Sequence, residues 1–181
     1  MYIGSRCWLV VVFGLVLSPV FAYGDVKFDE GRWRLELSGA RGIHSGSTDR
    51  EGDTLVTGSV EYEFPASART TLGLRLLPLF IYDQDDYETV VGGGFGLSGR
   101  LYQHAAEYRG WFGELGVSAL AHDGKIRRNS SNVNFLTGVG VGYQFKSNWH
   151  ATLRYEHLSN AGLGDHNAGV NTVGLAFGFT F

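Results

Sequence analysis

The sequence has little of what several common protein classes require. Its one cysteine, Cys7, lies among the first ten residues, so an intrachain disulfide is excluded. Charged residues make up only 18% of the chain, and a net charge of −3 without a basic cluster argues against a nucleic-acid-binding protein. Prolines number three, whereas the 27 glycines follow no collagen period and the 14% of aromatic residues argue against disorder.

The first 22 residues have the three parts of a secretory signal peptide. Arg6 supplies a positive n-region, residues 7–17 form an apolar stretch, and residues 19–22 resemble a small-residue cleavage site. The apolar stretch is shorter than the roughly 20 residues of a spanning helix. We therefore expect residues 1–22 to be a signal peptide and residues 23–181 to form one exported domain, which contains no cysteine for redox chemistry.

The rest of the chain alternates between apolar and polar or small residues, which is the signature of β-strands. Eight such segments are found, centred on residues 32–37, 60–64, 71–76, 91–101, 114–119, 133–145, 152–156 and 172–181. A soluble sandwich would also alternate. Two features favour a barrel instead: the second face is rich in glycine and charge, as in a filled barrel interior, and the terminal Phe181 resembles the recognition signal of outer-membrane barrels.

The predicted fold is therefore all-β, an eight-stranded antiparallel transmembrane β-barrel in the bacterial outer membrane. The connections at residues 65–69, 103–110 and 146–148 are short and are expected to be periplasmic turns, with both termini on that side. The connections at residues 40–53, 83–88, 122–131 and 160–170 are then expected to face outward. Pro78 falls near the outer end of its strand, where a bulge is tolerable.

In the seventh segment, polar side chains occupy the face that should point to lipid. By parity Leu153 and Tyr155 point outward, and so do His157 and Ser159. Residues two apart on a strand share a face about 7 Å apart, so their side chains can meet. A histidine beside a serine is the minimal arrangement for an activated hydroxyl. The alternative is that His157 is an interfacial side chain near lipid head groups.

Residues 154–163, followed by Asn167-Ala168-Gly169, resemble the PagL family of lipid A 3-O-deacylases. The similarity is specific around His-x-Ser-Asn-Ala-Gly at residues 157–162, whereas earlier parts of the chain share only the barrel plan. The resemblance implies a serine esterase on the outer barrel wall, at the level of the outer leaflet. It would remove the ester-linked 3-hydroxyacyl chain from the 3-position of lipid A in lipopolysaccharide.

The resemblance also implies roles for individual residues. Ser159 would be the nucleophile and His157 the general base. The candidate oxyanion donors are the backbone N–H of Gly162 and the side chains of Asn167 and Asn160.

One position departs from the family pattern. The family has a glutamate at the start of the last strand, and this chain has Asn171, which shares the outward parity of that strand. An amide can orient the imidazole through its carbonyl oxygen, but it cannot stabilise the positive imidazolium as a carboxylate does. Asp165 in the preceding loop is the alternative acid, because the parity of Glu156 points it into the barrel. A catalytically inactive relative is the third interpretation.

The remaining histidines do not suggest a metal site. His44, His122 and His166 are expected in outer loops, and no histidine pair has the spacing, with an acid, of metal ligands. The sequence thus predicts neither a metal nor a cofactor, and its expected partner is lipid A in the outer membrane, with no nucleic acid. It leaves open whether the barrel works alone or as a homodimer. The rival functions are a non-enzymatic barrel for adhesion or membrane integrity, and another barrel enzyme such as an acyltransferase or protease.

Overall fold

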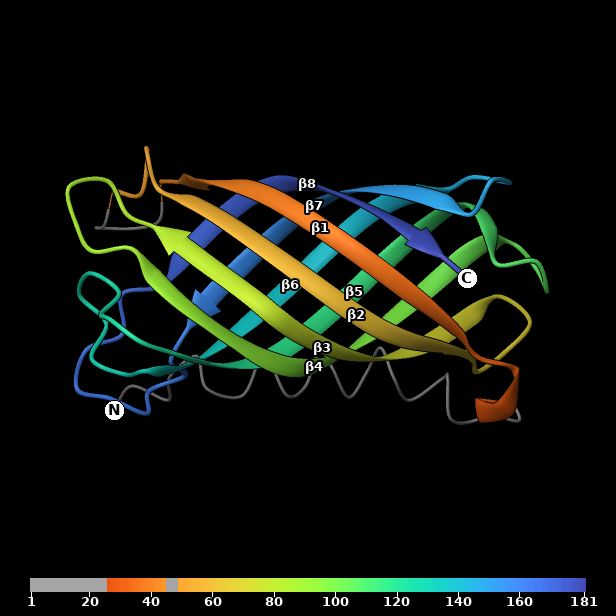
Figure 1. The fold of residues 1–181 in the computed structure, drawn as a ribbon, viewed down its shortest axis with the longest axis horizontal. Helices are drawn as coiled ribbons and strands as arrows, with labels where there is room; N and C mark the ends of the chain where they lie inside the picture. The colour runs from red at the N-terminus through yellow and green to blue at the C-terminus, as the bar shows by residue number, and fades with distance from the viewer. Residues whose placement is uncertain (1–25, 45–48) are drawn as a thin grey trace, which may run out of the picture.

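The computed structural model describes residues 26–44 and 49–181, in which eight strands close into one antiparallel barrel (Figure 1). Each strand pairs with the next along the chain, and the last closes onto the first. The strands are β1 (Arg32–Ile43), β2 (Thr54–Pro65), β3 (Thr70–Asp83), β4 (Val90–His104), β5 (Arg109–His122), β6 (Val133–Gln144), β7 (Trp149–Ser159) and β8 (Val170–Thr180). The expected signal peptide lies outside the described residues. In the described chain, no helix is long and apolar enough to span a membrane.

The predicted alternation is confirmed by the burial of successive side chains. In β1, Leu35 and Leu37 are exposed on the outer face. Arg34, on the opposite face, is buried with 1% of its surface exposed. The same contrast holds in β7, where Leu153 is exposed and Arg154 is buried. An outer wall of exposed leucine, valine and phenylalanine needs hydrocarbon around it, and this is the arrangement of a membrane barrel.

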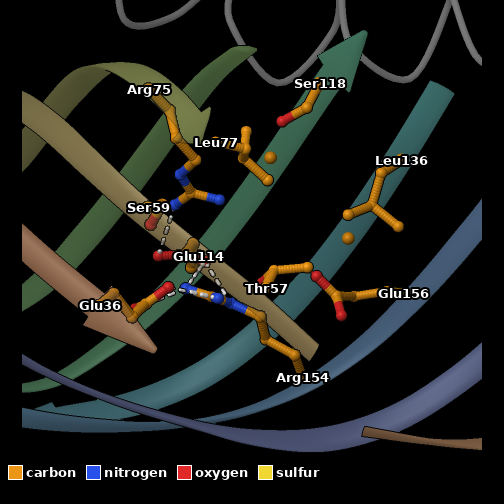
Figure 2. A pocket seen from close by; sticks show the side chains of 12 residues that line it. Glu36, Thr57, Ser59, Arg75, Leu77, Glu114, Ser118, Leu136, Arg154 and Glu156 are labelled. Carbon is orange, nitrogen blue, oxygen red and sulfur yellow. Dashed lines mark hydrogen bonds and ion pairs between the residues drawn. The ribbon is translucent and has the colours of Figure 1, made fainter. Parts of the chain in front are cut away.

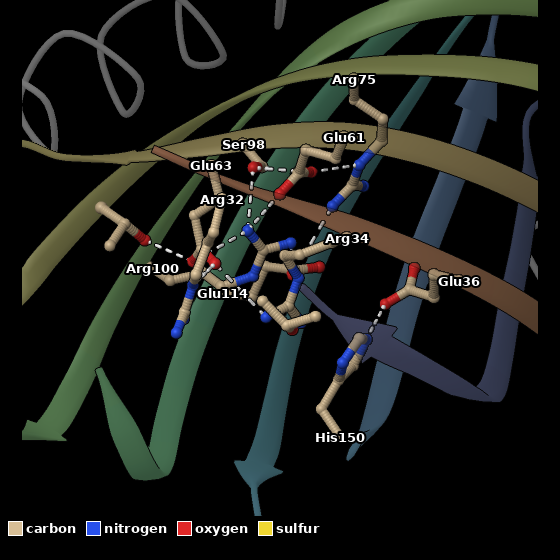
Figure 3. A network of polar contacts seen from close by, with 12 residues as sticks. Arg32, Arg34, Glu36, Glu61, Glu63, Arg75, Ser98, Arg100, Glu114 and His150 are labelled. Carbon is tan, nitrogen blue, oxygen red and sulfur yellow. Dashed lines mark hydrogen bonds and ion pairs between the residues drawn. The ribbon is translucent and has the colours of Figure 1, made fainter. Parts of the chain in front are cut away.

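Buried ion pairs fill the lumen (Figure 3). Arg100 forms an ion pair with Glu61 and another with Glu114, the latter 2.6 Å long between Nη2 and Oε2. Further along the barrel, Arg154 Nη1 lies 2.5 Å from Glu36 Oε1. The pocket in Figure 2 lies within this lumen, and four of the charged side chains that line it, Glu36, Arg75, Glu114 and Arg154, form ion pairs. The charged face of the strands therefore fills the barrel interior, as predicted from the sequence.

The two ends of the barrel differ. The turns after β2, β4 and β6 are short and lie at one end together with the 3₁₀ helix η1 (Phe28–Glu30) and the C-terminus (Figure 1). The four longer connections lie at the other end, which we call the loop end. At the turn end, outward-facing aromatic rings pair across neighbouring strands, including exposed Trp33 with half-buried Tyr62 at 5.0 Å between ring centroids. Such a girdle is typical of a membrane interface.

Two local expectations have definite outcomes. The pairing of β3 with β4 shifts register between Leu77 and Phe80, so Pro78 does sit at an irregularity of its strand. The assignment of His122 to an outer loop was wrong, because His122 is the last residue of β5 and is buried. The strand extends this far because His122 pairs in register with Gly92 of β4, and its N–H also bonds to Asn132 O at the base of the following loop.

Candidate functional site

His157 and Ser159 lie on the outward face of β7, close to the loop end. Both are half-buried, while Leu158 between them is 2% exposed and points inward. Tyr155, two residues earlier, is exposed on the outer wall. The two polar residues are therefore on the wall and not in the lumen, as their parity predicted.

Asn171 on β8 contacts the imidazole of His157 directly. The two residues are register partners, and His157 Nδ1 lies 2.6 Å from Asn171 Oδ1. A carbonyl oxygen can only accept a hydrogen bond, so Nδ1 carries the proton and donates it. In the neutral imidazole, Nε2 is then the unprotonated nitrogen, which is the form needed to take a proton from a hydroxyl.

Gly169 forms the other support of the imidazole. A Cβ built on Gly169 would lie 2.7 Å from His157 Cε1 and 3.4 Å from Nε2, so only glycine leaves space for the ring here. The ring is thus held between the backbone of residue 169 and the amide of Asn171. The sequence alone predicts no role for Gly169, although this glycine belongs to the Asn167-Ala168-Gly169 segment that resembles the family.

Ser159 is the last residue of β7 and pairs in register with Phe135 of β6. Among the described residues, its hydroxyl has no hydrogen-bond partner. Its position two residues beyond His157 on one face puts the two Cα atoms about 7 Å apart. In free enzymes, hydrogen bonds between a nucleophile and its base are often long and shorten only when substrate is bound.

The loop after Ser159 is held by the side chain of Asn160, which is fully buried. Its Nδ2 donates to Asn129 Oδ1 at 3.0 Å and to the His166 carbonyl at 2.9 Å, and its Oδ1 accepts from the Gly162 N–H at 2.9 Å. Both candidate donors are therefore engaged in this structure: the Asn160 amide supports the loop, and the Gly162 N–H points to Asn160.

Asn167 differs from these two donors because it is exposed and its amide is fixed at one end only. Its Oδ1 accepts from the Asn160 N–H at 3.0 Å, and residue 167 forms an isolated β-bridge with Asn129. In the described part of the chain, the Asn167 NH₂ group has no acceptor. Of the three candidate oxyanion donors, the Asn167 side chain is thus the one available to a ligand.

A chain of buried amides connects this loop to the barrel interior. Asn129 Nδ2 donates to Asn134 Oδ1 at 2.7 Å, and Asn134 Nδ2 donates to His122 Nε2 at 2.6 Å. Together with Asn160, these residues link β5, β6 and the two loops around the site. Sequence patterns do not predict this chain of amides, because its members are far apart in sequence and follow no strand or helix period.

The structure does not bring the alternative acid to the histidine. Asp165 is exposed and forms no ion pair or hydrogen bond with any described residue, whereas Glu156 is buried inside the barrel. Asn171 is the residue placed against His157. Within the described ranges, no group of three or more histidine, cysteine or acidic side chains is arranged to hold a metal ion.

The fold and the outward polar cluster define a class: an eight-stranded outer-membrane barrel with a polar site on its outer wall. The model of the lipid A 3-O-deacylase (PagL) family matches residues 20–180. The chain belongs to this family and is an integral outer-membrane protein.

Solved structures agree with the fold. The crystal structure of the outer membrane enzyme PagL has a TM-score of 0.62 at 19% identity, covering 80% of this chain and 98% of that one. The N-terminal β-barrel domain of Pseudomonas aeruginosa OprF has a TM-score of 0.51 at 19% identity, covering 87% of this chain and 100% of that domain. No curated protein matches the sequence.

Proposed function

We propose that this protein is a lipid A 3-O-deacylase that uses Ser159 as nucleophile and His157 as general base. The observation that carries the proposal is the hydrogen bond from His157 Nδ1 to Asn171 Oδ1 on the outer wall. It fixes both the tautomer and the direction of an imidazole that is two residues from Ser159, whose hydroxyl has no hydrogen-bond partner among residues 26–44 and 49–181. The family match supports the choice of substrate, and the contact between His157 and Asn171 supports the choice of residues.

The first step is the attack of Ser159 Oγ on the carbonyl carbon of the acyl ester. His157 Nε2 takes the hydroxyl proton as the new C–O bond forms, and returns it to the sugar oxygen when the ester bond breaks. Water, activated by the same nitrogen, then attacks the acyl-serine, releases the 3-hydroxy fatty acid and regenerates Ser159. Each proton passes through one imidazole nitrogen, because the other donates to Asn171.

The oxyanion of each tetrahedral intermediate would be stabilised by the NH₂ group of Asn167. The bond from the Asn160 N–H to Asn167 Oδ1 orients this amide with its donor end exposed. In a site without water, one well-placed donor contributes about 3–4 kcal/mol to stabilisation of the transition state. The Gly162 N–H would contribute only if it exchanged its present acceptor, Asn160 Oδ1.

The position of the site suits a substrate that stays in the membrane. His157 and Ser159 lie at the loop end of the wall, and we place this end in the outer leaflet with both termini in the periplasm. A lipid could then diffuse sideways to the wall, with its sugar at the level of the loops and its acyl chains beside exposed Tyr155 and Leu153. The lumen, which ion pairs fill, takes no part in this route.

Mass spectrometry of lipid A tests the proposal directly. Cells that express the protein should contain lipid A that lacks one hydroxyacyl chain, and cells that express Ser159→Ala should contain the full set. Ser131→Ala, a change in a neighbouring loop, is the matched control and should act like the wild type. Unaltered lipid A in cells with folded wild-type protein would favour a non-enzymatic barrel.

A further inference from the structure

Arg41 is a charged side chain on the outward face of β1, near the proposed site. It is exposed, and the residues on either side of it, Ala40 and Gly42, are buried. We consider the inner positions of the eight described strands, without the first and last residue of each. At these positions, Arg41 and His157 are the charged or imidazole side chains that face outward. A charge on the wall of a membrane barrel is unfavourable unless it lies near an interface or meets a counter-charge.

The strand register places Arg41 close to the histidine. Ile43, Asn171 and His157 form one row across β1, β8 and β7. The next outward-facing row, two residues closer to the turn end, consists of Arg41, Val173 and Tyr155 on the same three strands. Two strand spacings and two residues along a strand put the Cα atoms of Arg41 and His157 about 12 Å apart. A long side chain at this distance can reach a ligand whose reacting group is at His157.

The part of the chain that the structure describes provides no counter-charge for Arg41. Among the described residues, the guanidinium forms no hydrogen bond or ion pair. The neighbours on its own strand and on both adjacent strands carry no carboxylate; they are Gly39, Ile43, Thr54, Val56, Asn171 and Val173. An anionic partner for Arg41 must therefore come from outside the barrel.

We propose that Arg41 binds a phosphate on the sugar of the glycolipid whose ester is being cleaved. This inference rests on the proposed function and names the part of the substrate that the wall recognises. A guanidinium matches phosphate in two parallel hydrogen bonds, and such charged bonds are strong beside hydrocarbon. The phosphate would anchor the sugar at β1 while the ester is held beside Ser159, two strands away.

The test uses the purified barrel in detergent micelles with two substrates, phosphorylated lipid A and the same molecule without its phosphates. Arg41→Gln should lower kcat/KM on the phosphorylated substrate about tenfold and leave kcat/KM on the phosphate-free one unchanged. Arg41→Lys should keep part of the activity. Arg69→Gln, which removes an exposed arginine at the turn end, is the matched control and should change neither value. Heat-dependent gel migration shows that each variant is folded.

Four results would overturn the proposal. Equal losses on both substrates, or no loss on either, would show that Arg41 does not recognise a substrate phosphate. Arg41→Gln could also lower kcat/KM on the phosphate-free substrate only when phosphatidylglycerol is added to the micelles. That result would show that Arg41 binds a neighbouring lipid instead of the substrate. Wild-type protein that cleaves neither substrate would refute the proposed function itself, and this outcome is distinct from a wild type that is active but insensitive to Arg41→Gln.

Discussion

Replacing Gly169 by alanine should disable the site without unfolding the barrel. The added Cβ would lie 2.7 Å from His157 Cε1, and carbon atoms prefer a separation of about 3.5 Å, so the ring must withdraw by roughly 0.8 Å. That movement lengthens the 2.6 Å bond to Asn171 or turns Nε2 away from Ser159. A misplacement of about 1 Å at a reacting group costs on the order of 10²-fold in rate.

The assay compares kcat for release of the hydroxy fatty acid by wild type and Gly169→Ala in the same micelles. We expect kcat to fall about 100-fold, while KM changes little because substrate contacts on the wall remain. Gly39→Ala is the matched control: it is another glycine of the outer wall, and a Cβ there meets nothing within 4 Å. It should keep wild-type kcat. Full activity of Gly169→Ala would refute the view that this glycine positions the imidazole.

Three further predictions concern the imidazole, the buried amides and the lumen. Asn171→Glu should raise kcat by about tenfold, because a carboxylate can stabilise the imidazolium as well as orient it. Asn171→Ala should lower kcat. A strong loss of kcat in Asn171→Glu, measured in the same fatty-acid assay, would point to another partner for His157. Asn134→Leu removes the link between His122 and Asn129, and should lower kcat by a larger factor than it lowers the urea midpoint of unfolding. A lower urea midpoint with an unchanged kcat would show that the amide chain does not support the site. Arg100→Leu leaves buried Glu61, Glu63 and Glu114 with fewer partners, and should lower the free energy of unfolding in detergent by about 3–5 kcal/mol; an unchanged urea midpoint would contradict the role given to these ion pairs.

The barrel was predictable because its two faces differ so strongly in chemistry. A strand such as β7, with Leu153 and Tyr155 on one face and Arg154 and Glu156 on the other, fixes its own orientation from local sequence alone. The ends of the strands were less predictable. His122 sits on β5 because it pairs with Gly92 of β4 and bonds to Asn132 across the loop, and these contacts have no local signal.

The site was predictable only in part, for a related physical reason. Parity put His157, Ser159 and Asn171 on the outer wall, but the contact between His157 and Asn171 depends on the register between β7 and β8, which the loop between them sets. The space that Gly169 leaves for the imidazole, and the amide chain through Asn129 and Asn134, arise from contacts between segments distant in sequence. Such contacts could not be obtained from one strand at a time.

The ion pairs that occupy the barrel interior have a consequence for the cell. Because Arg100, Glu114 and Arg154 form ion pairs across the lumen, we expect the described barrel to offer no aqueous conduit between the two sides of the membrane. Making more of it should therefore leave permeability to small antibiotics and nutrients as it was. Any change in the barrier would have to come from the altered lipids around the protein, and it would spread as far as those lipids diffuse.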